Sequence, residues 1–240
     1  MRIATIDPGR PNLLMDHLQL GLRQAEIGVT AGADQARGAA DSAGGAASRA
    51  GGAGDPAEPV EPVEPVEPHF YLSLYVIPWS REMGAGHVAL LRHRGPGGPS
   101  ADMTLTDNPS LGRAPQANLR TVGYSRVDLG SEPRPASFVR SPLHEQGHIR
   151  YLISAPGLEI EARWDDLGEA IFAYGPAPQR PDSQRIGSVL FEAGRGSAAG
   201  NGAAVPGHTY AMEHWIPWLG RALYSAHVAR GEILVDNGAG

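Results

Sequence analysis

The sequence predicts a mainly β (α+β) protein: an antiparallel curved sheet, or a calycin-like barrel or sandwich, with an N-terminal helix and a short internal helix. Short apolar runs recur from His69 onward, and Gly/Pro turns such as Ala155-Pro156-Gly157 separate them. The run 158–164 alternates strictly between apolar and charged residues. Closely spaced strands with few helices form sheets that close or double over.

The N-terminal segment, residues 1–30, is predicted to hold a short strand at 2–6 and then a helix from Pro11 to about Gly28. Leucines spaced four residues apart lie on one face of such a helix: Leu14, Leu18 and Leu22. We expect this helix to dock on the main body.

Residues 31–68 form the predicted linker. Its first part is rich in Ala, Gly, Ser and Asp and lacks large apolar residues, so it cannot bury enough surface to offset the entropy of ordering. Glu58 to Pro68 repeats Glu-Pro-Val, which is typical of an extended, semi-rigid spacer. Residues 69–240 remain as the main β-rich domain.

Strands are predicted along this domain at 70–79, 86–94, 103–106, 121–129 and 136–140, in a hairpin at 149–164, and at 170–174 and 185–193. Asp107-Asn108-Pro109 predicts a short helix to about Leu119, because proline is favoured at the first helical position. Residues 194–207 are predicted to be a loop. The segment 208–235 fits either a helix that begins at Ile216-Pro217-Trp218 or a closing strand, and the sequence leaves both open.

The composition excludes several classes of function. The formal net charge is −6, the chain has no lysine, and its arginines are scattered, so no basic stripe for nucleic acid is present. The absence of cysteine removes disulfides, thiol nucleophiles and cysteine metal sites. No apolar run has the length of a membrane-spanning helix, so we expect a cytoplasmic protein without a membrane partner. The oligomeric state stays open.

A possible zinc motif stands immediately before the hairpin. His144-Glu145-Gln146-Gly147-His148 matches HExxH, in which two histidines on one helix face bind Zn²⁺ and the glutamate acts as base. Glu169 lies at a distance that resembles the third ligand of thermolysin-like gluzincins. The motif works only on a helix, whereas the residues from Ile149 alternate like a strand. We therefore favour the strand and no cofactor, with zinc as the alternative.

The default ligand site of a small barrel is its mouth, an apolar surface with a few polar groups that orient the ligand. Histidine titrates near neutrality and tyrosine offers a hydroxyl donor, which makes three residues candidates for catalysis: His87, Tyr151 and His214. Two arginines and two tryptophans are candidates for ligand binding: Arg140, Arg163, Trp79 and Trp164.

The sequence thus favours a β-barrel-like protein that binds a small, partly apolar metabolite. Its enzymatic form is a cofactor-free isomerase or hydratase, and the sequence leaves open whether it is catalytic at all. One alternative is the zinc-dependent hydrolase. Another is a non-catalytic interaction module, in which the acidic Pro-rich spacer presents one element to a partner.

Overall fold

The computed structural model describes residues 10–24, 68–81, 83–95, 100–113, 132–141, 147–176 and 184–236. They belong to one compact unit formed by Met1–Gln24 and Pro68–Gly240. The predicted linker up to residue 67 and the strands predicted at 2–6 and 121–129 lie outside the described residues.

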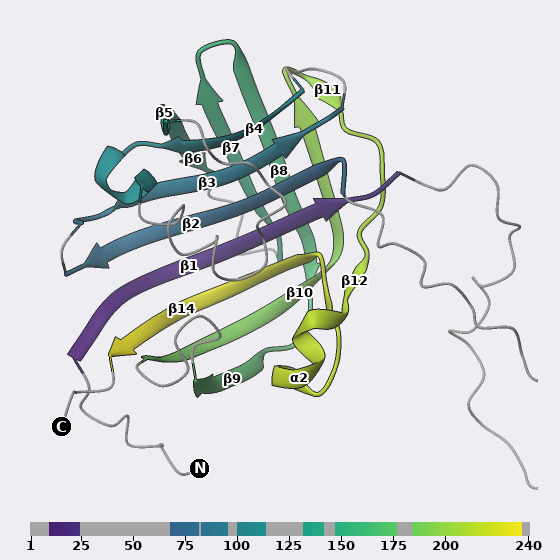
Figure 1. Cartoon of the computed structure of the whole chain (residues 1–240). Coiled ribbons are helices and arrows are strands. Elements are labelled where there is room, and N and C mark those ends of the chain that lie inside the picture. The colour runs from purple at the N-terminus through teal and green to yellow at the C-terminus, as the bar shows by residue number, and fades with distance from the viewer. Residues whose placement is uncertain are drawn as a thin grey trace, which may run out of the picture. The chain divides into compact units, whose positions relative to one another are not determined.

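Strands dominate this unit (Figure 1). They are β1 (Arg10–Leu22), β2 (Phe70–Ser80), β3 (Gly86–His93), β4 (Ala101–Thr106), β5 (Arg134–Pro135), β6 (Ser137–Arg140), β7 (Ile149–Ala155), β8 (Leu158–Leu167), β9 (Ile171–Pro176), β10 (Gln184–Gly200), β11 (Ala203–Ala204), β12 (Ala211–Met212), β13 (Leu223–Tyr224) and β14 (Ala226–Asp236). The helical residues in the described part are 109–113, η2 (Glu213–Trp215) and α2 (Ile216–Leu219). Among the described residues, no helix is long and apolar enough to cross a membrane.

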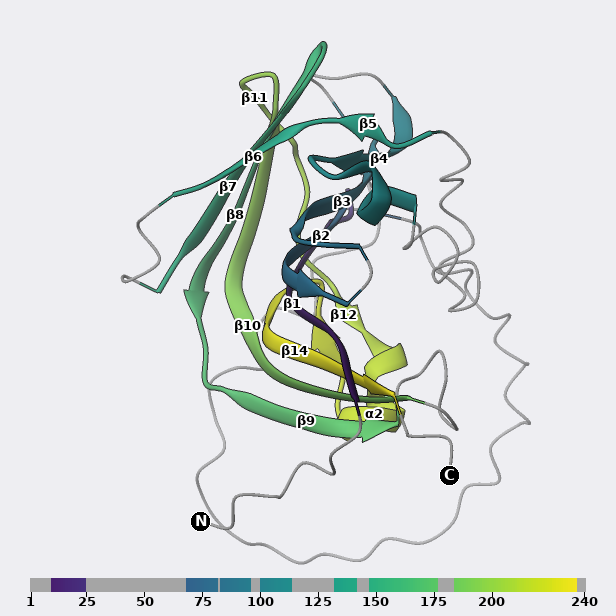
Figure 2. The same cartoon turned by 90° about the vertical axis from the view of Figure 1, so that its left-hand side faces the viewer.

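The main sheet closes almost completely into a barrel. Its strand order is β5-β4-β3-β2-β1-β14-β10-β8-β7-β6. A single residue, Ala136, separates β5 from β6, and its amide donates to Thr106 O at 2.9 Å while Arg140 pairs with Tyr151 on β7. The segment Arg134–Arg140 therefore joins both ends of the sheet, with β6 to β8 in one wall and β1 to β4 in the other (Figure 2). The mainly β, barrel-like prediction is confirmed.

The predicted N-terminal helix is wrong, because Arg10–Leu22 is a central strand between β2 and β14. A spacing of four residues is an even number, so it also keeps leucines on one face of a strand. Leu18, Leu20 and Leu22 point into the core, and Gln19 between them is buried as well. Burial of both faces hides the alternation that identifies a strand from sequence.

The predicted loop at 194–207 is also wrong over most of its length, because β10 continues to Gly200 and β11 follows. The first half of β10 pairs with β14 and β9, and the second half pairs with β8. A Cβ on Gly196 would lie 2.5 Å from Leu20 Cδ1 and 2.7 Å from Ala226 Cβ. The small residues of this long, bent strand let the side chains of neighbouring strands pack closely against it.

The other described elements agree with the predictions within a few residues, including the hairpin of β7 and β8. The internal helix begins at Pro109, and the Asn108 side chain accepts a hydrogen bond from Ser110 N at 3.0 Å, as an N-cap residue does. The segment 208–235, which the sequence left open, contains both kinds of structure: η2 and α2, then β13 and β14.

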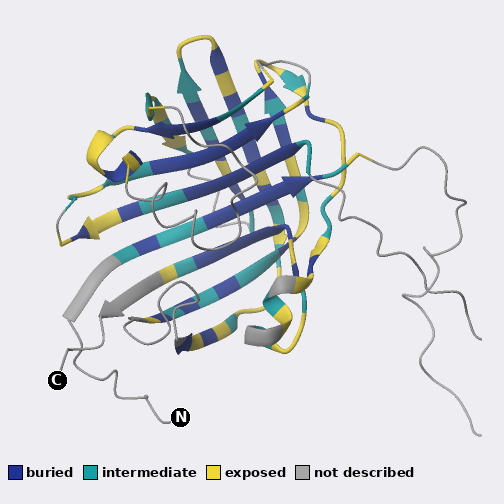
Figure 3. Ribbon diagram, in the orientation of Figure 1, coloured by how far each residue is buried: buried dark blue, intermediate teal, exposed yellow. Residues whose placement is uncertain are grey.

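The inner face of the β1–β4 wall is built in cross-strand layers. Three of them are mostly apolar: Leu22, Phe70, His93 and Ala101; Leu20, Leu72, Leu91 and Met103; Leu18, Leu74, Ala89 and Leu105. The next layer contains Asp16, Val76 and His87 in register, and Asp107 follows the end of β4. Figure 3 shows the deep burial of these strands. The barrel interior therefore changes from apolar to polar at one end.

Candidate functional site in the barrel interior

Charged and aromatic side chains from both walls meet at the polar end of the barrel. We call this group the inner polar cluster: Asp16, His87, Asp107, Phe138, Arg140, Tyr151 and Arg230. It draws on β1, β3, β6, β7 and β14 and on the turn after β4. Barrel closure thus assembles residues that are more than 200 positions apart in the chain.

His87 and Asp107 form a hydrogen-bonded pair. His87 Nδ1 lies 2.7 Å from Asp107 Oδ2, and the backbone amide of His87 donates to Asp107 Oδ1 at 2.6 Å. A carboxylate against Nδ1 favours the tautomer with its proton on Nδ1 and leaves Nε2 as an acceptor. Nε2 has no hydrogen-bond partner among the described residues. This geometry leaves Nε2 of His87 able to accept a proton.

The turn that holds Asp107 has local causes. Thr106 Oγ1 donates to His87 O at 2.7 Å, and Asn108 Nδ2 donates to the carbonyls of Met83 and Ala85, both at 3.0 Å. Gly86 lets the carboxylate approach β3, because a Cβ there would lie 2.7 Å from Asp107 Oδ1. The helix start at Asn108-Pro109 and a glycine before His87 together fix the pair.

The opposite wall contributes two aromatic rings. The ring of Phe138 stacks on the imidazole of His87 with centroids 5.0 Å apart and planes 9° apart. The ring of Tyr151 approaches the same imidazole at 6.5 Å between centroids. Burial raises the pKa of the Tyr151 hydroxyl, and the charge and hydrogen bond of Arg140 oppose this rise. Tyr151 is thus a protonated hydrogen-bond donor at neutral pH.

Arg140 is the cross-strand neighbour of Tyr151. Its Nε and Nη2 atoms are buried and have no hydrogen-bond partner among the described residues. No described carboxylate pairs with it. Burying guanidinium nitrogens without acceptors costs several kcal/mol as an order of magnitude. An anionic group from outside the chain would remove this cost.

Arg230 differs from Arg140 because it has a carboxylate partner. Arg230 Nε lies 3.0 Å from Asp16 Oδ2, and Asp16 Oδ1 accepts from Gly231 N at 2.9 Å. Both charges are near enough to act on the pKa of Tyr151, Asp16 raising it and Arg230 lowering it. Within the described part of the chain, Arg140 is therefore the arginine of the inner polar cluster that has no carboxylate partner.

The structure brings together three of the residues predicted from sequence and separates the others. His87, Arg140 and Tyr151 meet in the inner polar cluster. Arg163 is exposed on the outer side of β8, with its Nη2 3.3 Å from Asp165 Oδ1, since Ala162 and Trp164 take the inward positions. Trp164 is fully buried and donates to Gln19 O at 2.7 Å, so it is a core residue that spans the barrel.

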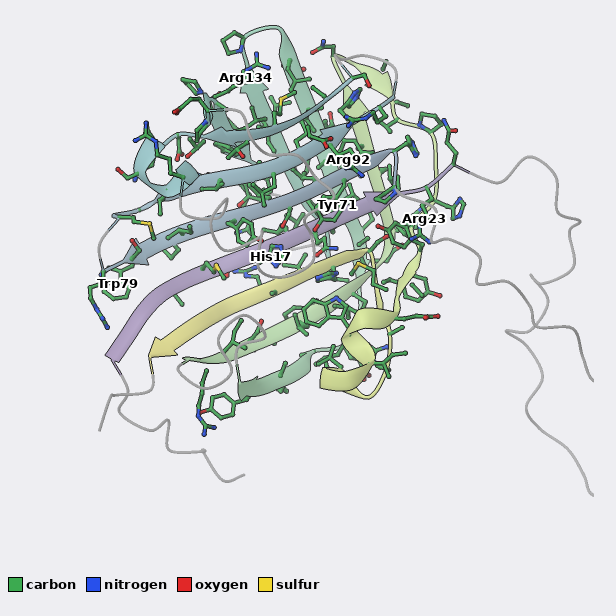
Figure 4. The ribbon with its side chains drawn as sticks, viewed as in Figure 1. His17, Arg23, Tyr71, Trp79, Arg92 and Arg134 are labelled. Atoms are coloured by element: carbon green, nitrogen blue, oxygen red, sulfur yellow. The ribbon has the colours of Figure 1, made fainter. Side chains whose placement is uncertain are left out.

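The remaining candidates lie elsewhere. Trp79 is 44% exposed at the end of β2, away from His17 in the middle of β1 (Figure 4). His214 belongs to η2, and its side chain lies outside the described part.

The last two residues of the HExxH motif are not helical. Gly147 has a φ of +78°, a left-handed conformation, and β7 begins at Ile149. His148 Nδ1 lies 3.9 Å from Asp165 Oδ1, and Glu169 is exposed after β8. His144 and Glu145 lie outside the described residues. Within the described ranges, no group of three His, Cys, Asp or Glu side chains could hold a metal ion.

Sequence reasoning missed Asp16, Asp107, Phe138 and Arg230 as site residues. Asp16 stood in the segment predicted as a helix, and its ion pair with Arg230 depends on the pairing of the first and last strands of the sheet. Asp107 had a usable signal. A carboxylate just after a short strand, opposite a strand histidine, is a candidate partner for that histidine.

A second group of imidazoles lies on the outer face of strands β1 and β14. His17 stacks on Tyr75 with centroids 4.5 Å apart, its Nε2 lies 2.7 Å from Ser73 Oγ, and His227 packs edge-on at 6.2 Å. Burial, and then the charge of His227, lowers the pKa of His17 to about 3. His17 is neutral at neutral pH and packs against its neighbours in the outer face.

No family model matches the sequence, and no curated protein is significantly similar to it. Among solved structures, acetoacetate decarboxylase from Legionella pneumophila subsp. pneumophila str. Philadelphia 1 is similar at 12% identity and a TM-score of 0.37, over 95% of this chain and 88% of that one. A TM-score this low does not establish a shared fold. The hydrogen-bonded sheet and the inner polar cluster define a barrel protein with one polar end.

Proposed function

We propose that the inner polar cluster binds a small α-oxo acid and catalyses its keto–enol isomerisation without a cofactor. The observation that carries the proposal is Arg140, whose two buried nitrogens lack acceptors among the described residues and which lies in the same cluster as an imidazole oriented by a carboxylate. A carboxylate is the anion that matches a planar guanidinium, because it accepts two parallel hydrogen bonds.

The residue paired with Arg140 indicates which second functional group the ligand carries. Tyr151 is paired directly with Arg140, so a group bound by its hydroxyl would lie next to the bound carboxylate. A carbonyl adjacent to a carboxylate is an α-oxo acid. A tyrosine kept protonated by burial stabilises negative charge that develops on such a carbonyl oxygen.

His87 would perform the proton transfer. Its Nε2 takes a proton from the carbon beside the carbonyl, the electron pair of that C–H bond forms the C=C bond, and the carbonyl oxygen becomes an enolate held by Tyr151. Nε2 then returns the proton to that oxygen, which completes the enol and restores the neutral imidazole. Asp107 stabilises the imidazolium that forms in between. Covalent catalysis through a lysine Schiff base is closed to a chain without lysine.

The test is deuterium exchange at the carbon beside the carbonyl of α-ketobutyrate, followed by proton NMR in D₂O. We expect the wild-type protein to accelerate the exchange and His87→Gln to abolish the acceleration. Arg140→Gln should weaken binding of α-ketobutyrate by about tenfold to a hundredfold, since a hydrogen bond to a charged group contributes roughly 1.5–3 kcal/mol.

Arg163→Gln is the matched control, because Arg163 is an exposed arginine on the outer side of the same wall. It should leave both binding and exchange unchanged. Equal binding by the Arg140→Gln variant, or exchange no faster than without protein, would show that the proposal is wrong.

A further inference from the structure

The edge strand β9 presents two large aromatic side chains that the proposed reaction does not use. Phe172 is 81% exposed and Tyr174 is 56% exposed, whereas Ala173 between them is buried against Leu190. Figure 3 shows this alternation along β9. Exposing both rings of one strand face is costly for a protein in water, so a contact for this face is expected.

The exposed face of β9 is continuous with the face that holds the inner polar cluster. Phe172 is the cross-strand neighbour of Val189 on β10, and Val189 is the neighbour of Arg230 on β14. Directly paired residues point to the same side of a sheet. Arg230 in turn contacts Asp16, and the layer continues through Val76 to His87. One sheet face thus runs from exposed aromatics to the general base.

Tyr174 lies on the same face of β9, two residues after Phe172. It is paired with Gly187, where a Cβ would lie 3.4 Å from Tyr174 Cδ2, so the ring lies against a residue that has no side chain. The guanidinium of Arg185 lies 6.0 Å from the centre of this ring. The glycine adds no side chain beside the ring, which is 56% exposed.

From these relations we infer that Phe172 and Tyr174 bind the apolar tail of an amphipathic α-oxo acid whose carboxylate is held by Arg140. The inference rests on the proposed function and names the substrate class of that site. Phe172 lies two strands from Arg230, roughly 10 Å away. Arg230 acts on the pKa of Tyr151, so it is close to the head-group position. A medium-length alkyl chain reaches further along this face than the ethyl group of α-ketobutyrate does.

The experiment compares the dissociation constants of α-ketobutyrate and α-ketooctanoate by isothermal titration calorimetry. We expect the wild-type protein to bind α-ketooctanoate at least tenfold more tightly, because burying an apolar chain against aromatic rings contributes more than 1.4 kcal/mol. Phe172→Ser, together with Tyr174→Ser, should remove most of this preference and leave the affinity for α-ketobutyrate unchanged. Since both side chains are exposed, the double variant should fold normally.

Val139→Ser is the matched control, because Val139 is 58% exposed and stands next to Arg140 on β6 but on the outer face. It should preserve the preference. Equal affinity for the two acids in the wild-type protein, or a preference that survives in the double variant, overturns the tail site while the proposed function stands. Failure to bind either acid overturns the proposed function itself. A change in oligomeric state on Phe172→Ser, measured by light scattering, would instead identify this face as a contact between copies and overturn the inference.

Discussion

Nδ1 of His87 lies 2.7 Å from Oδ2 of Asp107, and the second oxygen of this carboxylate holds the backbone amide of the same histidine. One side chain therefore fixes both the backbone and the ring of the residue that we propose as general base. Such a double contact sets the direction of Nε2 more strictly than a single hydrogen bond.

Asp107→Asn should reduce the rate of deuterium exchange by about a hundredfold or more while the affinity for α-ketobutyrate changes little. The amide oxygen can still accept from His87 N, but the NH₂ group then faces Nδ1 and favours the tautomer with its proton on Nε2. Nitrogen-15 NMR of His87 reports this tautomer independently of any ligand. An unchanged tautomer would contradict the positioning role.

Gly86→Ala should lower the free energy of unfolding by about 1–3 kcal/mol, as overpacking does. The added Cβ would meet Asp107 Oδ1 at 2.7 Å and Asn108 Cβ at 2.9 Å, so the turn must shift. Urea denaturation measures the change. Gly168→Ala is the control and should be nearly neutral, because its nearest atom, Glu192 O, is 3.5 Å away.

His17 should make stability depend on pH in the acid range. Its pKa is about 3 in the folded protein and 6.5 without burial, so below pH 6.5 the unfolded chain binds a proton that the folded chain does not. The free energy of unfolding therefore falls as the pH decreases from 6.5 towards 3, with a slope of up to about 1.4 kcal/mol per pH unit from this group.

His17→Gln should remove that part of the slope in urea denaturation curves measured between pH 7 and pH 4, and the carboxylates contribute equally to both proteins. His208→Gln, at an exposed histidine, should retain the wild-type slope. Parallel curves for wild type and His17→Gln would show that His17 titrates normally.

Trp164→Phe should destabilise the protein by about 2–3 kcal/mol, through the lost hydrogen bond to Gln19 O and the space left by the smaller ring. Trp79→Phe, at a tryptophan that is 44% exposed, should change stability by less than about 0.5 kcal/mol. Thermal unfolding of the pair checks the difference, and similar values for both would contradict the role of Trp164 in joining the walls.

Strands with one buried face and one exposed face could be predicted from sequence, as the β7–β8 hairpin illustrates. Its period-two pattern survives because Glu159, Glu161 and Arg163 point away from Ile160 and Ala162. Turn chemistry was equally informative, since Asn108-Pro109 marks the helix start.

Elements buried on both sides could not be identified in this way. In β1, Gln19 is buried on one face as deeply as Leu18 and Leu20 are on the other, and the spacing of four fits a strand as well as a helix. Gly196 resembles a loop residue because the sequence does not show Leu20 and Ala226 packed against it.

The candidate site was predictable only in part, for a similar reason. His87, Arg140 and Tyr151 could be proposed from residue type alone. That they meet, and that Arg230 is paired with Asp16 while Arg140 is not, follows from contacts between distant strands.

The short segment Arg134–Arg140 has a consequence for the integrity of the molecule. It is the seam of the barrel, bonded to β4 on one side and β7 on the other. A nick or an insertion within it would release two strand edges with unpaired amides and carbonyls, which invite pairing between molecules. Resistance to fibril formation thus depends on a stretch of seven residues that also carries Arg140.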